Sequence, residues 1–225
     1  MEVFIHPTPE AASESVTSRI AASLEASGDR FTLGLSGGTT PAPVYRALAG
    51  LGLSWERADL WLSDERWVPH DHQRSNGAMV METLVRHIDA RLHRPKWSDR
   101  LEPSDSAAHY ETVIRALHRH HRPDIIHLGM GADGHTASLF PRTAALDASS
   151  RWIVANPVPE LGETRITSTF PLLWSARTLV IQATGGAKAE AVRDSLTGKT
   201  PAGRLVEGDA EVEWHLDESA ASLIS

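Results

Sequence analysis

The sequence predicts an α/β fold in which a mostly parallel, doubly wound sheet is covered by helices on both faces. The main observation is a repeated order: a short apolar segment, a turn rich in glycine or charge, and then a helical pattern. This order occurs four times. Each time it begins with an apolar segment that we expect to be a strand, at residues 31–35, 58–62, 125–128 and 178–183. Strands that alternate with helices connect in parallel, and parallel sheets are buried on both faces.

Length and composition favour one folded unit. The chain has 225 residues, of which 41% are hydrophobic and 23% are charged, and this composition is ordinary for globular proteins. The sequence has no internal repeat and no long linker. We therefore expect residues 1–225 to form a single domain.

The N-terminal elements follow from spacing and capping residues. Val3 to Ile5 are typical of a short strand. Thr8 is a residue type that caps helices, and Pro9 fits the first helical turn. Apolar residues then recur at helical spacing until Gly28 ends the pattern. A second helix is expected after the strand at 31–35, with apolar residues at positions 44, 48 and 51.

The later elements follow from the same periodicities. Helical patterns cover residues 75–88, 107–121 and 187–196, and short strands are expected at 152–155 and 165–170. Ser75 or Asn76 is expected to cap the first of these helices. Residues 89–105 contain two prolines that break any periodicity, so we interpret them as a surface connection. The histidines near residue 120 are expected at a solvated helix end rather than in a zinc site, because neighbours on a helix point to different faces.

Charge and cysteine content narrow the classes of function. The chain has 22 Lys and Arg against 29 Asp and Glu, a net charge of −7, which disfavours nucleic acid and anionic membranes as partners. It has no cysteine, which excludes disulfide scaffolds, thiolate zinc sites and thiol nucleophiles. No segment approaches the ~18 apolar residues of a membrane span, and the N-terminus has no secretory pattern. We therefore expect a cytoplasmic protein whose anionic ligands need a local positive site.

Four turns are expected to meet in one crevice. In a doubly wound sheet, ligands bind outside the carboxyl ends of the strands, where backbone amides and helix N-termini point toward the ligand. The turns that follow predicted strands are residues 36–40, 64–66, 129–135 and 185–188. They carry the candidate functional residues.

The first turn suits a phosphate group. Its sequence is Ser36-Gly37-Gly38-Thr39-Thr40, and Pro41 then starts a helix. Free amides, hydroxyls and the positive helix end together favour a phosphate monoester. The alternative is an ordinary glycine turn with a threonine cap. The turn lacks the Gly-Lys-Ser/Thr ending of a nucleoside triphosphate loop, so no such nucleotide is implied.

Two cations stand on other turns. Lys188 is one of three lysines and lies at the start of a predicted helix, where its charge opposes the helix dipole unless an anion is bound nearby. Arg66 can clamp an oxyanion or a phosphate with its planar guanidinium. The alternatives are a surface lysine and a solvated ion-pair cluster. Asp64 and Glu65 either contact the ligand or organise the crevice.

The turn at 129–135 carries a candidate base. A neutral His135 can accept a proton near neutral pH, and a nearby Asp133 can orient its ring. The alternative is that Asp133 caps a helix beginning near His135. Three glycines here spell a dinucleotide fingerprint. However, no second acid at a strand end follows ~20 residues further on, and prolines interrupt the region, so NAD is not expected.

These turns, taken in order, resemble the glucosamine-6-phosphate isomerase/6-phosphogluconolactonase family. The likeness covers nearly the whole chain and rests on the blocks 35–41, 64–69 with Ser75-Asn76, 129–141, 165–173 and 184–189. The block Ala137-Ser138-Leu139-Phe140-Pro141 is similar to that of the lactonases, whereas the deaminases share the Asp-Gly-His core and continue differently. The resemblance implies a three-layer αβα, Rossmann-like fold.

The resemblance also implies an activity and a site. The activity is hydrolysis of 6-phospho-D-glucono-1,5-lactone to 6-phospho-D-gluconate in the oxidative pentose phosphate pathway, with neither metal nor nucleotide as cofactor. The implied catalytic residues are His135 as general base, Asp133 and Arg66. The resemblance implies Arg66 and Lys188 as substrate-binding cations and Gly37, Gly38, Thr39 and Thr40 as the phosphate loop. We also expect Ser36, Asp64 and Gly134 to bind the substrate.

The implied partner is a small sugar-phosphate lactone, and we expect a monomer or a weak homodimer. Two other functions stay open. One is a glucosamine-6-phosphate deaminase or related sugar-phosphate isomerase, which needs an acid placed to move a proton between sugar carbons. The other is a non-catalytic sugar-phosphate sensor.

Overall fold

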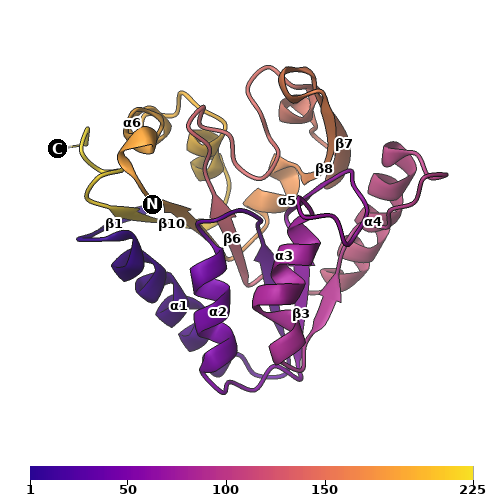
Figure 1. The fold of residues 1–225 in the computed structure, drawn as a ribbon, viewed down its shortest axis with the longest axis horizontal. Coiled ribbons are helices and arrows are strands. Elements are labelled where there is room, and N and C mark those ends of the chain that lie inside the picture. Colours follow the sequence, from indigo (N-terminus) through magenta and orange to yellow (C-terminus); the bar gives the residue numbers. More distant parts are fainter. Residues whose placement is uncertain (225) are drawn as a thin grey trace.

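A seven-stranded parallel sheet forms the centre of the molecule (Figure 1). The computed structural model describes residues 1–224. Every strand pairs in parallel with its neighbours, as the sequence predicts. In spatial order the strands are β1 (Glu2–His6), β10 (Glu211–Asp217), β9 (Thr178–Ala183), β6 (Ile125–Gly129), β2 (Phe31–Leu35), β3 (Ala58–Leu62) and β5 (Arg91–His93).

Helices cover both faces of the sheet, which gives the three-layer αβα arrangement. The α-helices are α1 (Pro9–Ala26), α2 (Ala42–Gly50), α3 (Asn76–Thr83), α4 (Pro103–Leu117), α5 (Phe170–Trp174) and α6 (Ala189–Leu196). Short 3-10 helices are η1 (Val85–His87), η2 (Ala144–Asp147), η3 (Pro159–Leu161), η4 (Gly186–Lys188) and η5 (Ala202–Glu207). One apolar cluster joins α1, α2 and α3 to the sheet, and another joins α4, α5 and α6 to it.

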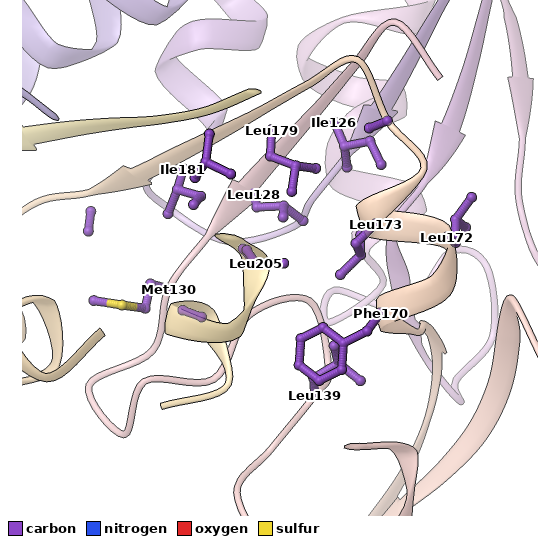
Figure 2. Close-up of a cluster of buried hydrophobic side chains, with 14 of the residues drawn as sticks. Ile126, Leu128, Met130, Leu139, Phe170, Leu172, Leu173, Leu179, Ile181 and Leu205 are labelled. Carbon is purple, nitrogen blue, oxygen red and sulfur yellow. The ribbon is translucent and has the colours of Figure 1, made fainter. Parts of the chain in front are cut away.

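Alternation along the central strands separates the two clusters. Ile125 of β6 belongs to the first cluster, whereas Ile126 and Leu128 belong to the second, because successive side chains of a strand point to opposite faces. Figure 2 shows residues of β6 and β9 in the second cluster together with Phe170 and Leu173 of α5. Each fully buried side chain of this kind contributes about 1.5–3 kcal/mol, so the sheet is a firm base for the loops at its end.

A second, smaller sheet is antiparallel. Its strands are, in spatial order, β4 (Asp64–Arg66), β8 (Glu163–Ser168) and β7 (Ile153–Val158). Residues 64–66, which were predicted as a turn, are therefore a strand. The sequence did not reveal this strand because its partner lies about a hundred residues away. The backbone NH of Ser168 donates to the carbonyl of Ser63 over 2.8 Å, which joins the small sheet to the end of β3.

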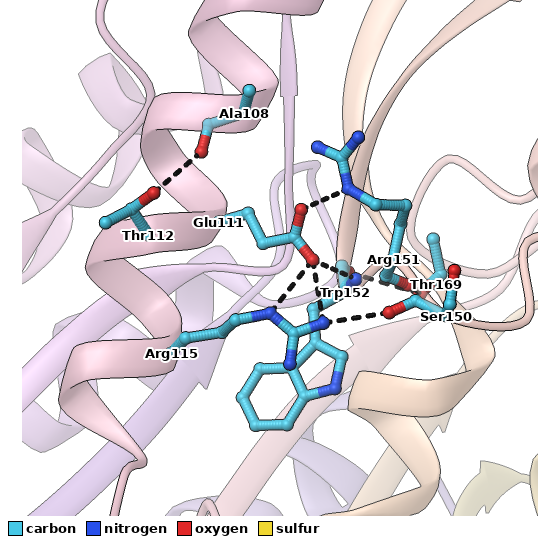
Figure 3. A network of polar contacts seen from close by, with 8 residues as sticks. All are labelled: Ala108, Glu111, Thr112, Arg115, Ser150, Arg151, Trp152 and Thr169. Atoms are coloured by element: carbon cyan, nitrogen blue, oxygen red, sulfur yellow. Dashed lines mark hydrogen bonds and ion pairs between the residues drawn. The ribbon is translucent and has the colours of Figure 1, made fainter.

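A buried carboxylate ties helix α4 to the start of β7 (Figure 3). Glu111 accepts hydrogen bonds from the backbone NH of Trp152 at 2.7 Å and from Nη2 of Arg115 at 2.9 Å. Arg151 donates to its other oxygen. The Arg115 guanidinium also lies 4.6 Å from the centre of the Trp152 ring. The small sheet therefore has a fixed orientation on the helical layer.

Two predicted helix caps are confirmed. The side chain of Thr8 accepts from the NH of Ala11 at 3.2 Å, with Pro9 as the first helical residue. The side chain of Ser75 accepts from the NH of Ala78 at 3.0 Å at the start of α3. Each cap satisfies a backbone donor that the first helical turn leaves free.

Two local predictions are wrong, and one strand was missed. Residues 89–105 are not only a surface connection, because they contain edge strand β5, and Pro103 begins α4 in the one helical position that suits proline. Strand β10 was not predicted. No α-helix of the described chain follows β6 directly; Gly134, Ala137 and Arg142 have φ of 77°, 48° and 63°, and such left-handed residues interrupt a right-handed helix.

The environment of His118 also differs from the prediction. This residue ends α4, but its side chain is buried at 6% exposure, with the rings of Trp61 and Trp152 at 5.8 and 6.5 Å. Its neighbours His120 and His121 are exposed, as expected.

The order of the strands identifies where a ligand would bind. From β2 the chain continues outward to β3 and β5, and then returns to β6 on the other side of β2 before continuing to β9 and β10. The reversal lies between β2 and β6. In open α/β sheets the binding crevice lies at the carboxyl ends of such a strand pair. Among residues 1–224, no helix combines the length and the apolar character needed to cross a bilayer.

Candidate active site

A cavity of about 550 Å³ lies at the carboxyl ends of the strands. It is lined by residues from the turns after β2, β6 and β9 and from the strands of the small sheet. The predicted site residues that line it are Ser36, Gly37, Gly38, Thr39, Thr40, Asp64, Arg66, Asp133, His135 and Lys188. The cavity therefore brings together all four turns singled out in the sequence.

Gly134 is the one predicted site residue outside this lining. Its φ of 77° is left-handed, and a Cβ atom there would lie 2.5 Å from Cβ of Thr200. Its carbonyl accepts from the NH of Ala202 at 3.0 Å. The residue thus shapes the turn between Asp133 and His135 and packs it against the segment before η5.

His135 is held in place on three sides. Its Nδ1 lies 2.5 Å from Oδ1 of Asp133, and its ring stacks on Phe140 with centroids 4.0 Å apart. A Cβ atom on Gly131 would lie 2.2 Å from the imidazole, so only glycine lets the ring pack against this backbone. Because Asp133 makes a hydrogen bond with the ring instead of capping a helix, the alternative interpretation of this turn is wrong.

The pKa of Asp133 reflects this pairing. Partial burial acts to raise the pKa, but the hydrogen bond and charge of His135 outweigh it and hold the pKa below its usual value. Asp133 is therefore ionised near neutral pH, and because a carboxylate can only accept, Nδ1 of His135 is the donor in this hydrogen bond.

The loop 36–40 leads into α2 without a side-chain cap. The threonine cap considered as an alternative is thus not formed, and the backbone NH groups of Ala42 and Val44 have no side-chain cap, whereas Pro43 between them has no NH. Tyr45 bridges the NH and carbonyl of Ser36 at 3.0 and 3.1 Å. A Cβ atom on Gly37 would lie 1.7 Å from Oδ1 of Asn76. The loop is therefore seated directly on this amide.

Asn76 joins this loop to β4. Its Nδ2 donates to the carbonyl of Asp64 at 2.9 Å and to Oδ1 of the same residue at 3.1 Å. Both partners are acceptors, so the amide must point this way and place Oδ1 under Gly37. The sequence identified Asn76 as a possible helix cap and as part of the family resemblance, but not as a support of the loop 36–40.

Glu65 organises the backbone around the site without lining the cavity. The residue is only 4% exposed. Its carboxylate accepts hydrogen bonds from the NH groups of Arg66, Asn76 and Gly77 at 2.7–2.8 Å. It also accepts from the hydroxyl of Ser75 at 2.9 Å. Burial raises its pKa, although these hydrogen bonds act in the opposite direction. Glu65 does not line the cavity, so of the two roles left open for it, the structural one fits.

Asp64 does line the cavity, and both of its carboxylate oxygens have donors. Asn76 donates to Oδ1, and the hydroxyl of Ser138 donates to Oδ2 at 2.6 Å. Ser138 belongs to the block that distinguishes lactonases in the resemblance. The sequence alone offered no reason to pair these two residues.

The cations of the site have few counterions. Nζ of Lys188 donates to the carbonyl of Met130, and burial lowers its pKa. Within the described chain Arg66 forms no ion pair; its Nη1 donates to the carbonyl of Arg74 at 2.6 Å. Arg165, which the sequence did not identify as a site residue, also lines the cavity. Residues 1–224 contain no cluster of three His, Asp or Glu side chains that could hold a metal ion.

Comparison with known proteins assigns the family. The family model of glucosamine-6-phosphate isomerases/6-phosphogluconolactonase matches residues 7–214. The chain belongs to this family. Within the family, it is 36% identical to a 6-phosphogluconolactonase of Synechocystis over 218 residues, which cover 91% of this chain and 89% of that one. It is 31% identical to a 6-phosphogluconolactonase of Haemophilus influenzae, with 85% and 87% covered.

Solved structures of the family have the same fold. The 6-phosphogluconolactonase of Thermotoga maritima matches with a TM-score of 0.85 and 26% identity, covering 96% of this chain and 99% of that one. The 6-phosphogluconolactonase of Trypanosoma brucei matches with a TM-score of 0.86 and 25% identity, covering 100% and 98%. A monomeric glucosamine-6-phosphate deaminase matches with a TM-score of 0.85 and 25% identity, covering 99% and 100%. Both activities of the family therefore occur on this fold.

Proposed function

We propose that this family member hydrolyses 6-phospho-D-glucono-1,5-lactone to 6-phospho-D-gluconate, with water activated by His135. The observation that carries the proposal is that the Asp133–His135 pair shares one cavity with the loop 36–40 and Lys188. A base and an anion site in the same cavity fit a substrate with a reactive lactone at one end and a phosphate at the other. The relatives named 6-phosphogluconolactonase support the same activity.

Binding of the phosphate would come first. The uncapped start of α2, the NH groups of Gly37 and Gly38 and the charge of Lys188 suit a dianionic group. A substrate held in this way presents its lactone in one orientation, which lowers the entropic cost of the reaction.

His135 would then take a proton from a water molecule as that water attacks the lactone carbonyl. Asp133 holds the proton on Nδ1, so that Nε2 is the nitrogen that accepts the proton from water. The same carboxylate stabilises the imidazolium that forms. Arg66 is placed to stabilise the tetrahedral oxyanion. When the ring C–O bond breaks, the imidazolium returns the proton to the departing oxygen, which gives an alcohol and a carboxylic acid. The acid then releases its proton to solvent and becomes a carboxylate.

The deaminase or isomerase alternative is weaker in this chain. Proton transfer between sugar carbons needs a free carboxylate base, and Asp64 is the buried acid of the cavity. Its two oxygens already accept hydrogen bonds from Asn76 and Ser138, so this carboxylate is committed to the contacts that join β4 to α3 and to the block 137–141. The Asp133–His135 pair likewise argues against a sensor that only binds sugar phosphates.

A direct assay tests the proposal. Freshly prepared 6-phosphogluconolactone is incubated with the protein, and acid release is followed and corrected for spontaneous opening. We expect turnover well above the uncatalysed rate. Release of ammonia from glucosamine 6-phosphate without lactone opening would support the deaminase, and binding of the lactone without turnover would support the sensor.

A further inference from the structure

Arg66 and Arg165 form a pair that the family resemblance did not anticipate. They are direct register partners across β4 and β8, and both line the cavity. Directly opposed side chains on neighbouring antiparallel strands lie close together, and like charges there are destabilising. Proteins keep such an arrangement where an anion compensates it.

The local charge balance is positive. Glu163 pairs with Arg165 at 3.0 Å and also with Arg74. In the described residues, no carboxylate pairs with Arg66. Asp64 of β4 is the other carboxylate whose charge acts on Arg165, so three guanidinium groups at this corner of the molecule face two carboxylates.

Both arginines also have unused donors. The Nε atoms of Arg66 and Arg165 are covered and have no hydrogen-bond partner in the described chain. Arg165 is only 8% exposed, and burial together with the charge of Arg66 lowers its pKa. A buried charge with an unpartnered donor is costly unless a ligand or water completes it.

The pair lies beside the candidate base. The Phe140 ring stacks on His135 at 4.0 Å, and the Arg165 guanidinium lies 5.9 Å from the centre of the same ring. Both side chains are therefore near the same aromatic ring. The loop 36–40 and Lys188 line the same cavity from other elements.

We propose that Arg165, together with Arg66, forms a second anion subsite that binds the carboxylate of a phosphorylated aldonic acid, the product of the reaction. Two planar guanidinium groups can bind one carboxylate with charge-assisted hydrogen bonds. The identity of the ligand rests on the proposed function. The cavity would accordingly prefer sugar phosphates with a carboxylate at C1 to those with a neutral C1.

The preference can be measured by calorimetry with two ligands that differ only at C1. One is 6-phosphogluconate, and the other is glucitol 6-phosphate, in which a hydroxymethyl group replaces the carboxylate. We expect the wild-type protein to bind 6-phosphogluconate at least about tenfold more tightly. Equal affinity for the two ligands in the wild type would overturn the subsite without any variant.

Two variants and a control assign the preference to Arg165. Arg165→Gln should reduce the ratio of the two affinities by about tenfold and change glucitol 6-phosphate binding much less. Arg165→Lys, which keeps the charge but not the fork, should retain an intermediate ratio. Arg142→Gln removes an exposed arginine paired with Glu160 and should leave the ratio unchanged.

The outcomes separate this proposal from the proposed function. Equal weakening of both ligands by Arg165→Gln, or an unchanged ratio, would contradict the subsite even if the enzyme hydrolyses the lactone. If Arg165→Gln does not fold, the wild-type and Arg165→Lys ratios decide. A wild-type protein that lacks lactonase activity but prefers the carboxylate ligand would refute the function and keep the subsite.

Discussion

Oδ1 of Asp133 accepts from the backbone NH of His135 at 3.1 Å and lies 2.5 Å from Nδ1 of the same residue. One carboxylate oxygen therefore fixes both the backbone turn and the ring of the imidazole. The arrangement requires Gly134 between them in a left-handed conformation and Gly131 beneath the ring. Because the two side chains are two residues apart, the pair belongs to the turn itself and does not depend on distant packing for its register.

Removing either member of this pair should lower turnover. We expect His135→Ala to reduce kcat for 6-phosphogluconolactone by about 10²–10⁴-fold, the range of a positioned general base. Asp133→Asn should also lower kcat, because the amide can hold the ring in the wrong tautomer. Acid release is measured with circular dichroism as a check on folding. Near-normal kcat in folded His135→Ala would place the base elsewhere.

Lys188→Ala should act on binding of the phosphate. The variant removes a partly buried ammonium from the cavity, so KM for the phosphorylated lactone should rise by about tenfold or more. The slow opening of unphosphorylated gluconolactone should change little. Lys199→Ala, outside the cavity lining, is the matched control. Equal damage to both substrates would contradict a phosphate role for Lys188.

Gly37→Ala should disturb the loop 36–40 through a steric clash alone. The new methyl group would lie 1.7 Å from Oδ1 of Asn76, and overpacking of this kind costs about 1–3 kcal/mol. We expect a lower urea midpoint and a higher KM. Gly50→Ala is the control, since nothing lies within 4 Å of its added Cβ. A Gly37→Ala variant with wild-type stability and KM would show that the loop is not seated on Asn76.

The parts of the fold that follow from local chemistry were predictable from the sequence. Thr8 and Pro9 mark the start of α1 because capping is decided within one helical turn. Strand β10 was missed although Val212, Trp214 and Leu216 alternate and are buried. The intervening residues are also polar enough to suit a loop, and pairing with β1 and β9 makes them a strand.

The residues of the candidate site likewise include some that were predictable from the sequence and some that were not. The four turns were predictable, because parallel strands bring their carboxyl ends to one edge of a sheet. Arg165 and Ser138 were not predictable as members of the site. Their positions depend on the antiparallel pairing of β4 with β8 and on the contact of Ser138 with Asp64, and these join segments far apart in sequence. No local pattern encodes such contacts.

The Ser138–Asp64 hydrogen bond should be visible as a coupling energy. Ser138→Ala removes a buried donor and should destabilise the protein by about 1–3 kcal/mol. In a double-mutant cycle with Asp64→Asn, measured by urea unfolding, we expect a coupling of about 0.5–3 kcal/mol. Ser18→Ala, on the exposed face of α1, should change stability by less than about 0.5 kcal/mol. Strict additivity of the two site variants would mean that the bond contributes nothing.

Two buried histidines should make the protein less stable in mild acid. Burial lowers the pKa of both His118 and His127 to about 4, whereas the unfolded chain titrates near the usual histidine value of ~6.5. Above pH 6.5 both states are neutral and the effect is absent. As the pH falls from about 6.5 to about 4, the unfolded state binds protons first, so the free energy of unfolding decreases, by up to on the order of 3 kcal/mol per histidine.

A substitution can isolate the contribution of His118. Both of its ring nitrogens lack partners in the described structure, so His118→Phe removes the titrating group without leaving another polar atom unpaired. Urea unfolding of this variant should depend less on pH between 7 and 5.5, a range in which most carboxyl groups stay ionised. His121→Gln, at an exposed position, should keep the wild-type slope. If His118→Phe also keeps that slope, His118 is not protonated on unfolding, and the acid sensitivity has another origin.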